Sequence, residues 1–276
     1  MSILRHIYFI MTMDKPSLIS TSETVFILIS QIKNKKAGMY FRFGDGDFNI
    51  VSGMDDMLAK TTPNFQHWMK EAMKIDDTTV MVCIPHHCKD TNTLEEGMYP
   101  GNHEYPIDMV RRFIYILSSI RNKIPDVLYT NIALSYCASR SPDIVIELHK
   151  ELKKNNILYI GNNMYSKEFL TKLFGDSIDT IYTPQRDSYF EHDSVFSTLD
   201  TLYTTKYNSM DFFVIIMAAG CGGRAFSAEI YSKYYNVKRN FFLFDYGSLL
   251  DYLWGYKSRA YMDIDPPKSQ YILESI

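Results

Sequence analysis

The sequence lacks the features that mark several large classes of protein. Its apolar N-terminal stretch, residues 7–13, is far shorter than the roughly 20 residues of a membrane-spanning helix, and no small-residue cleavage site follows it. The 29 basic residues are interspersed with 32 acidic ones, so no basic face for nucleic acid is expected. We therefore expect a soluble, cytoplasmic protein with no integral membrane segment and no nucleic-acid partner, and the oligomeric state is left open.

Signals for disulfides and N-glycosylation are also missing. Apart from Cys83 and Cys88, the cysteines lie far apart, and no Asn-x-Ser/Thr acceptor occurs. Both absences fit a reducing compartment. The pair His86-His87 lies between these two cysteines, but no second, distant Cys/His pair accompanies it. Structural zinc is therefore not expected, because it usually takes four well-spaced ligands.

No Pro-, Gly- or Ser-rich linker divides the 276 residues, so we expect one domain, with 1–20 as a possible N-terminal extension and 258–276 as a C-terminal tail. Short β-branched or aromatic runs alternate with segments of helical period. The strand candidates are 39–43, 79–84, 127–129, 157–160, 180–182, 212–217 and 241–244. The helix candidates are 22–35, 64–74, 107–120, 142–154, 166–174, 194–204 and 224–235. This alternation predicts an α/β fold with a single Rossmann-like, mostly parallel sheet and helices on both faces.

A glycine-flanked acidic pair follows the first strand candidate, in the run Arg42-Phe43-Gly44-Asp45-Gly46-Asp47. Two aspartates separated by one residue can direct both carboxylates at one point when the backbone is extended or loop-like, and glycine permits close approach of a ligand. A hard ion such as Mg²⁺ or Mn²⁺ needs only one or two such carboxylates when substrate phosphates complete its shell. The same residues also form ordinary polar turns, and the motif alone does not separate the two interpretations.

A second glycine-rich segment, Gly220-Cys221-Gly222-Gly223, lies between a strand candidate and an amphipathic helix candidate. Small residues at such a junction let backbone N–H groups face an anion, but glycine equally serves close packing of a helix on a sheet. The spacing does not match a dinucleotide fingerprint. The next strand candidate is followed by Asp245-Tyr246-Gly247-Ser248.

Together these segments resemble the GT-D fold of glycosyltransferases, from about Ser22 to about Trp254. That family carries Arg-Phe-Gly-Asp-Gly and a further acidic residue, usually Glu, after its first core strand. Later come a strand, a Gly-containing turn, a helix and a strand ending in Asp-x-Gly. In this chain Asp47 takes the place of the Glu, and Ser248 stands where a histidine commonly follows the last glycine.

The resemblance implies a glycosyltransferase that uses a divalent cation, Mn²⁺ or Mg²⁺. It would move a sugar, with glucose as the first guess, from a nucleotide-diphosphate sugar such as a UDP-sugar to a glycan or glycoprotein acceptor. Asp45 and Asp47 are the implied catalytic and metal-binding residues. Glu104 is a candidate general base in the long segment 85–106, with Glu96 and His103 as alternatives. The implied donor contacts are Arg42, Gly44, Gly46, Asn162, Arg186, Gly220, Gly222, Gly223, Asp245 and Tyr246. The implied acceptor contacts are His86, His87, His103 and Arg140.

Several of these residues have simpler interpretations, and two other functions stay open. Asn162 could cap the following helix, and Arg186 could form a surface ion pair with Asp187 or Glu191 instead of binding a diphosphate. The chain could also be a nucleoside-cofactor α/β enzyme such as a methyltransferase. The third alternative is a non-catalytic module that binds nucleotides or glycans, which the Ser248 replacement favours.

Overall fold

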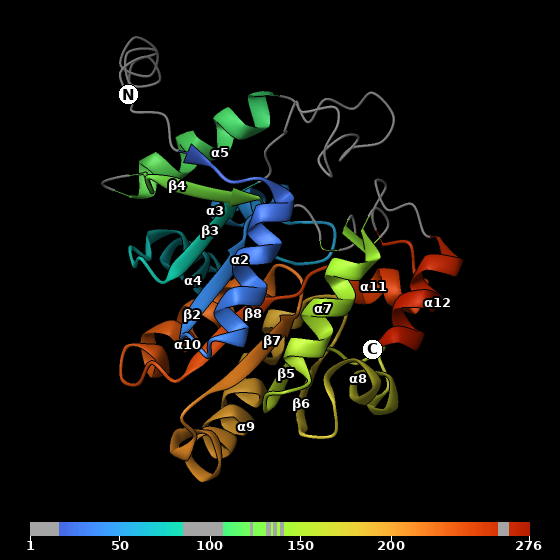
Figure 1. Ribbon diagram of the computed structural model, residues 1–276. Coiled ribbons are helices and arrows are strands. Elements are labelled where there is room, and N and C mark those ends of the chain that lie inside the picture. The colour runs from blue at the N-terminus through green and yellow to red at the C-terminus, as the bar shows by residue number, and fades with distance from the viewer. Residues whose placement is uncertain are drawn as a thin grey trace.

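A parallel β-sheet forms the centre of the protein (Figure 1). The computed structural model describes residues 17–84, 107–121, 124–130, 134, 137–138, 141–258 and 265–276. These residues form an eight-stranded sheet in the order β1-β4-β3-β2-β8-β7-β5-β6. The strands are β1 (Ser17–Leu18), β2 (Gly38–Arg42), β3 (Val80–Ile84), β4 (Val127–Thr130), β5 (Ile157–Asn162), β6 (Ile178–Thr183), β7 (Phe213–Ala218) and β8 (Phe241–Asp245). Every pairing between them is parallel, which confirms the predicted fold class.

Helices cover both faces of this sheet. They are α2 (Thr21–Lys33), α3 (Asp45–Val51), α4 (Pro63–Lys74), α5 (Ile107–Ile120), α7 (Pro142–Leu152), α8 (Lys167–Phe174), α9 (His192–Thr205), α10 (Gly222–Ile230), α11 (Leu249–Trp254) and α12 (Pro266–Ser275). Short helical turns η1 (Ser188–Glu191), η2 (Tyr207–Ser209) and η3 (Tyr231–Tyr235) complete the described elements. Among these helices, none has the length and apolar character that crossing a bilayer requires.

The alternation of side chains along each strand produces two apolar cores, one on each face. In β2, Met39 and Phe41 belong to the core that α4, α9 and α10 cover, whereas Tyr40 belongs to the core under α2, α7 and α8. This pattern is what buried parallel strands require, because successive side chains point to opposite faces and both faces are covered. It also explains why these strands appear in the sequence as continuous apolar runs.

The order of the strands creates a switch point in the middle of the sheet. Strands β2, β3 and β4 succeed one another on one side of β8, while β7, β5 and β6 lie on its other side. The register sets Tyr40 opposite Phe244 and Met217 opposite Asp245. The residues that follow β2, β7 and β8 are thereby gathered at one edge, where ligands of such sheets usually bind.

The acidic motif after β2 is helical. The extended or loop-like backbone that would direct both of its carboxylates at one point is therefore not formed. Residue Gly44 is the N-cap of α3, which begins at Asp45, and the Asp47 carboxylate accepts a hydrogen bond from the Gly44 N–H (2.7 Å). Carboxylates in the first turn of a helix satisfy its free N–H groups and face its positive end. Positions i and i+2 of a helix do not face each other. The two carboxylates therefore do not share one direction.

The C-terminal stretch predicted as a tail contains α12, which packs with α7 and α11 and buries Ile272 in the core. Its N-cap is Asp265, whose carboxylate accepts from the Lys268 N–H (3.2 Å). An aspartate followed by Pro266 is a common way to start a helix.

A fully buried histidine ties α7 to the segment after β8. The Leu173 carbonyl can only accept, so His149 Nδ1–H donates to it (3.1 Å), and Nε2 accepts from the Tyr246 hydroxyl (2.6 Å). Burial lowers the pKa of His149 to about 4, and His149 is therefore neutral in the folded protein at pH 7.

This histidine predicts a specific dependence of stability on acid. A folded pKa of about 4 lies below the ordinary value of 6.5, so its contribution to stability is present above pH 6.5 and is lost as the pH falls toward 4. The loss amounts to about 3 kcal/mol of the free energy of unfolding, since one pKa unit corresponds to about 1.4 kcal/mol.

We expect His149→Gln to be less stable than the wild type at pH 7 and to lose less stability between pH 7 and pH 4.5. Urea unfolding at several pH values measures both. The control variant His67→Gln, which replaces an exposed histidine on α4, should keep the wild-type acid dependence. Parallel curves for His149→Gln and wild type would contradict the buried, neutral state of His149.

Candidate functional site

A cavity of about 130 Å³ lies at the carboxyl edge of the sheet. Five strand ends contribute to its wall, through Arg42 at β2, Asn162 at β5, Pro184 after β6, Ala218 at β7 and Asp245 at β8. Ligand sites usually enclose about 300–1,000 Å³. The described residues would therefore surround only part of a ligand as large as a nucleotide sugar.

Four charged side chains form a buried network in and beside this cavity. Arg224 Nε lies 3.2 Å from Asp47 Oδ1, and Arg224 Nη1 lies 3.5 Å from Asp245 Oδ2. Arg42 Nε lies 3.3 Å from Asp245 Oδ1. The two carboxylate side chains are 1% and 4% exposed, so neither could remain ionised without these partners. Two positive and two negative charges thus balance within the site.

The network perturbs the proton affinity of its members. Burial raises the pKa of Asp47 to about 6, although Arg224 and the Gly44 N–H both act to lower it. Burial also works against the charge of Arg224, but Asp47 and Asp245 outweigh this effect and raise the pKa of the guanidinium. At neutral pH Asp47 is therefore ionised and Arg224 is charged.

Two glycines in left-handed conformations are associated with the arginines. Gly247 has φ of 57°, and a methyl group on it would overlap the Arg42 guanidinium. Gly220 also has φ of 57°, lines the cavity, and accepts a hydrogen bond from Arg224 Nη1 through its carbonyl. Both positions favour glycine because a positive φ is unfavourable for other residues, and position 247 also has no room for a side chain beside Arg42.

The other predicted glycines serve close packing. A Cβ on Gly46 would lie 2.8 Å from Asp56 Oδ1 and 3.0 Å from Cys221 Sγ, and one on Gly223 would lie 2.9 Å from Met217 Cγ. A methyl group on Gly222 would overlap the Ser188 hydroxyl. The glycine-rich turn thus lets α10 approach β7 and η1, with Gly220 alone of its glycines in the cavity wall.

The structure separates the remaining predicted residues into those at the cavity and those away from it. Asn162 lines the cavity, and its Oδ1 accepts from the Met164 N–H (3.0 Å) in a local turn. Asp45 is exposed at the start of α3 and does not line the cavity. Arg186 donates to the Met57 carbonyl (3.1 Å), outside the cavity wall. The Tyr246 side chain is fully buried against His149, so it cannot contact a nucleotide sugar bound in the cavity.

Five predicted residues lie outside the described part of the chain. They are His86, His87, His103, Glu104 and Arg140, and their predicted roles stay predictions. Gly44 is the N-cap of α3 and donates its N–H to Asp47.

The structure adds residues that the sequence analysis did not assign to the site, namely Arg224, Asp56, Tyr165 and Asp251. One signal for Arg224 was present in the sequence. A basic residue in the first turn of a helix faces the positive end of the helix dipole, which is unfavourable unless a carboxylate compensates it. The other three lie on segments without a motif.

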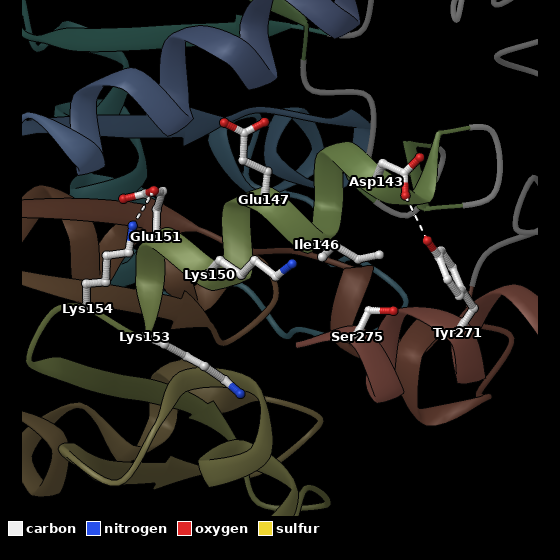
Figure 2. A pocket seen from close by; sticks show the side chains of 9 residues that line it. All are labelled: Asp143, Ile146, Glu147, Lys150, Glu151, Lys153, Lys154, Tyr271 and Ser275. Atoms are coloured by element: carbon white, nitrogen blue, oxygen red, sulfur yellow. Dashed lines mark hydrogen bonds and ion pairs between the residues drawn. The ribbon is translucent and has the colours of Figure 1, made fainter.

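A second, larger hollow of about 650 Å³ lies between α7 and α12, away from the strand ends (Figure 2). Its lining mixes lysine and acidic side chains, with Lys154 paired to Glu151 (2.7 Å) and Tyr271 bonded to Asp143 (3.1 Å). These contacts are typical of a solvated helix surface. Glu151 is buried there, but its partner Lys154 is exposed, so the hollow has no buried pair of opposite charges among its described lining residues.

Comparison with solved structures finds chains of the same fold. A new glycosyltransferase from Streptococcus sanguinis with domain of unknown function 1792 is 14% identical, with a TM-score of 0.58 and 92% of each chain covered. A second structure of this domain, described as a distinct glycosyltransferase fold, is 12% identical with a TM-score of 0.61, covering 92% of this chain and 88% of the other. A selenomethionine-substituted structure of the domain is also 12% identical with a TM-score of 0.61, covering 96% of this chain and 97% of the other.

At such identities the likeness is one of fold, and it confirms the glycosyltransferase fold that the sequence predicted. No protein-family model and no curated protein matches the chain by sequence.

The buried network predicts that its charges are energetically coupled. At pH 8 we expect Arg224→Met to destabilise the protein by about 3–5 kcal/mol, because Asp47 and Asp245 would stay buried without this guanidinium. The loss in free energy of unfolding caused by Asp47→Asn should be smaller in the Arg224→Met background than in the wild type, by about 1–3 kcal/mol. Urea unfolding of the wild type, the two single variants and the double variant measures this coupling as a double-mutant cycle. Effects that add within about 0.5 kcal/mol would show that the two groups do not interact.

Proposed function

We propose that this chain is a glycosyltransferase that takes its sugar from a nucleotide-diphosphate donor. The observation that carries the proposal is the network of Arg42, Asp245, Arg224 and Asp47 at the switch point of the sheet. The likeness of the fold to glycosyltransferases with domain of unknown function 1792 supports it.

The two arginines suit the leaving group of such a reaction. When the bond from the anomeric carbon to the diphosphate breaks, negative charge develops on the diphosphate oxygens. Arginine presents several fixed N–H donors to phosphate oxygens. Arg42 and Arg224 line the cavity, and their carboxylate partners hold them in place before a ligand arrives. Donors placed in advance stabilise developing charge without reorganising.

A divalent cation fits the same site, held by Asp47 and Asp245 instead of by Asp45 and Asp47. Asp47 Oδ1 and Asp245 Oδ2 are buried and accept no hydrogen bond among the described residues, and their charged partner is Arg224, at 3.2 and 3.5 Å. Carboxylate oxygens of this kind are ligands that Mg²⁺ and Mn²⁺ prefer. No cluster of three or more His, Cys, Asp or Glu side chains suited to a metal occurs in the described ranges, so donor phosphates would have to complete the shell. The ion would act as a Lewis acid on the departing diphosphate.

The balanced charge of the network favours this arrangement. Two arginines and two ionised aspartates supply no net charge to offset a diphosphate. A cation bound with the nucleotide sugar would supply that positive charge. The acceptor hydroxyl would attack the anomeric carbon and lose its proton to a base, for which Glu104 stays the candidate. We take UDP-glucose as the first donor to test and a glycan or glycoprotein as the acceptor.

The proposal predicts stabilisation by a nucleotide sugar. We expect a UDP-sugar with Mn²⁺ at about 100 times its dissociation constant to add about 2.7 kcal/mol to the stability and to raise Tm by about 5 °C or more. Thermal unfolding with a panel of nucleotide sugars, with and without Mn²⁺, measures this shift. Release of free sugar from a stabilising donor would then distinguish an enzyme from a binding module.

Two variants test whether the cavity is responsible. Arg42→Gln should lose most of the stabilisation by the donor, because it removes a guanidinium from the cavity wall. Tyr246→Phe should lower the Tm of the free protein, because it removes the hydroxyl that donates a hydrogen bond to His149 Nε2. It should keep the rise in Tm that the nucleotide sugar causes. A shift with S-adenosylmethionine alone, and none with any nucleotide sugar, would instead support a methyltransferase.

A further inference from the structure

Besides Asp245, two acidic residues line the cavity, Asp56 and Asp251, and their surroundings differ from those of the charge network. Asp245 faces two arginines, whereas Asp251 on α11 lines the same cavity and forms no ion pair with any described residue. An anion such as a diphosphate is repelled by an unpaired carboxylate and attracted by the arginines. The two parts of the cavity therefore suit two different parts of one ligand.

The Asp251 carboxylate is held in place by two hydroxyl groups. The Tyr165 hydroxyl donates to Oδ1, and the Ser258 hydroxyl donates to Oδ2. Tyr165 is itself buried, with its ring 6.1 Å from that of Trp254 and 6.0 Å from that of Phe169. Each oxygen of an ionised carboxylate has two lone pairs, so each can accept a further hydrogen bond after these.

The chemistry of this part of the cavity selects the kind of group that it can bind. An ionised carboxylate only accepts hydrogen bonds, so a partner must donate. Asn162 and Ser248 line the same cavity. Hydroxyl groups of a sugar can donate to the carboxylate, whereas a second carboxylate would be repelled by it.

We propose that Asp251, oriented by Tyr165 and Ser258, binds hydroxyl groups of the transferred sugar, and that this sugar is uncharged and not a uronic acid. The inference rests on the proposed function and goes further, because it names a binding residue for the sugar and the class to which the sugar belongs. Tyr165 and Ser258 are positioning residues that act through Asp251.

Calorimetry with matched ligands separates the sugar from the nucleotide. The probes are UDP, UDP-glucose and UDP-glucuronic acid, each with Mn²⁺; if UDP does not bind, they are GDP, GDP-mannose and GDP-mannuronic acid. In the wild type we expect the neutral sugar nucleotide to bind more tightly than the bare diphosphate, and the uronic acid form more weakly than the neutral one.

Asp251→Asn should weaken the binding of the neutral sugar nucleotide about 10- to 100-fold, as loss of hydrogen bonds to a charged group does, and should not weaken the binding of the bare diphosphate. It should also reduce the discrimination against the uronic acid. Asp143→Asn is the matched control, because Asp143 likewise accepts from a tyrosine hydroxyl, that of Tyr271, but lies at the hollow between α7 and α12 (Figure 2). It should change none of these constants. If Asp251→Asn does not fold, Tyr165→Phe tests the same ratio and should reduce the preference for the sugar nucleotide at least threefold.

The outcomes distinguish the two levels of the proposal. Binding of the diphosphate with an unchanged ratio of sugar nucleotide to diphosphate in both variants would overturn the role of Asp251 and leave the proposed function standing. Tighter binding of the uronic acid form by the wild type would overturn the sugar class. Failure of every nucleotide to bind would overturn the proposed function, and the sugar site with it.

Discussion

The ion pairs of Arg224 with Asp47 and Asp245 are the interaction on which the site depends. They join α10, α3 and the end of β8, and Asp245 passes the connection on to Arg42 at the end of β2. Burying four charges is expensive unless each has a partner, so the geometry around them must be held closely. Several local features follow from this requirement. Gly247 leaves space for Arg42, and the Gly220 carbonyl receives Arg224.

The same network links the fold to the chemistry. The switch in strand order sets β2 beside β8, although these two strands are far apart in the sequence, and β7 lies on the other side of β8. The charged groups come from the carboxyl ends of β2 and β8 and from the helices α3 and α10 that follow β2 and β7. The apolar cores on both faces fix these strands, so the charges are positioned by rigid elements. In the proposed function, a diphosphate would meet arginines already in place, and the sugar beyond it would meet a carboxylate held by Tyr165 and Ser258. The groups at the site decide the function, because the fold alone supports many activities.

Much of the fold was predictable from the sequence, but only part of the site was. All seven strand candidates form strands, because long apolar runs with β-branched and aromatic residues fit a sheet that is buried on both faces. The short α3 was missed because its glycines and aspartates favour turns, and its N-terminus depends on one carboxylate bonding back to the Gly44 N–H. Arg42 and Asp245 were found because they lie at the carboxyl ends of strands. Tyr246 was assigned to the donor, since the sequence does not show that its side chain turns inward to His149, nearly one hundred residues away in the chain (residues 149 and 246).

A crystal structure of the chain with a bound nucleotide sugar and Mn²⁺ tests the central claim most directly. We expect the diphosphate oxygens within hydrogen-bonding distance of Arg42 or Arg224, at the carboxyl ends of β2 and β8, with the sugar toward Asp251. A nucleotide bound elsewhere, for example in the hollow between α7 and α12, with the four charges of the network still paired as in the free protein, would contradict the proposed function.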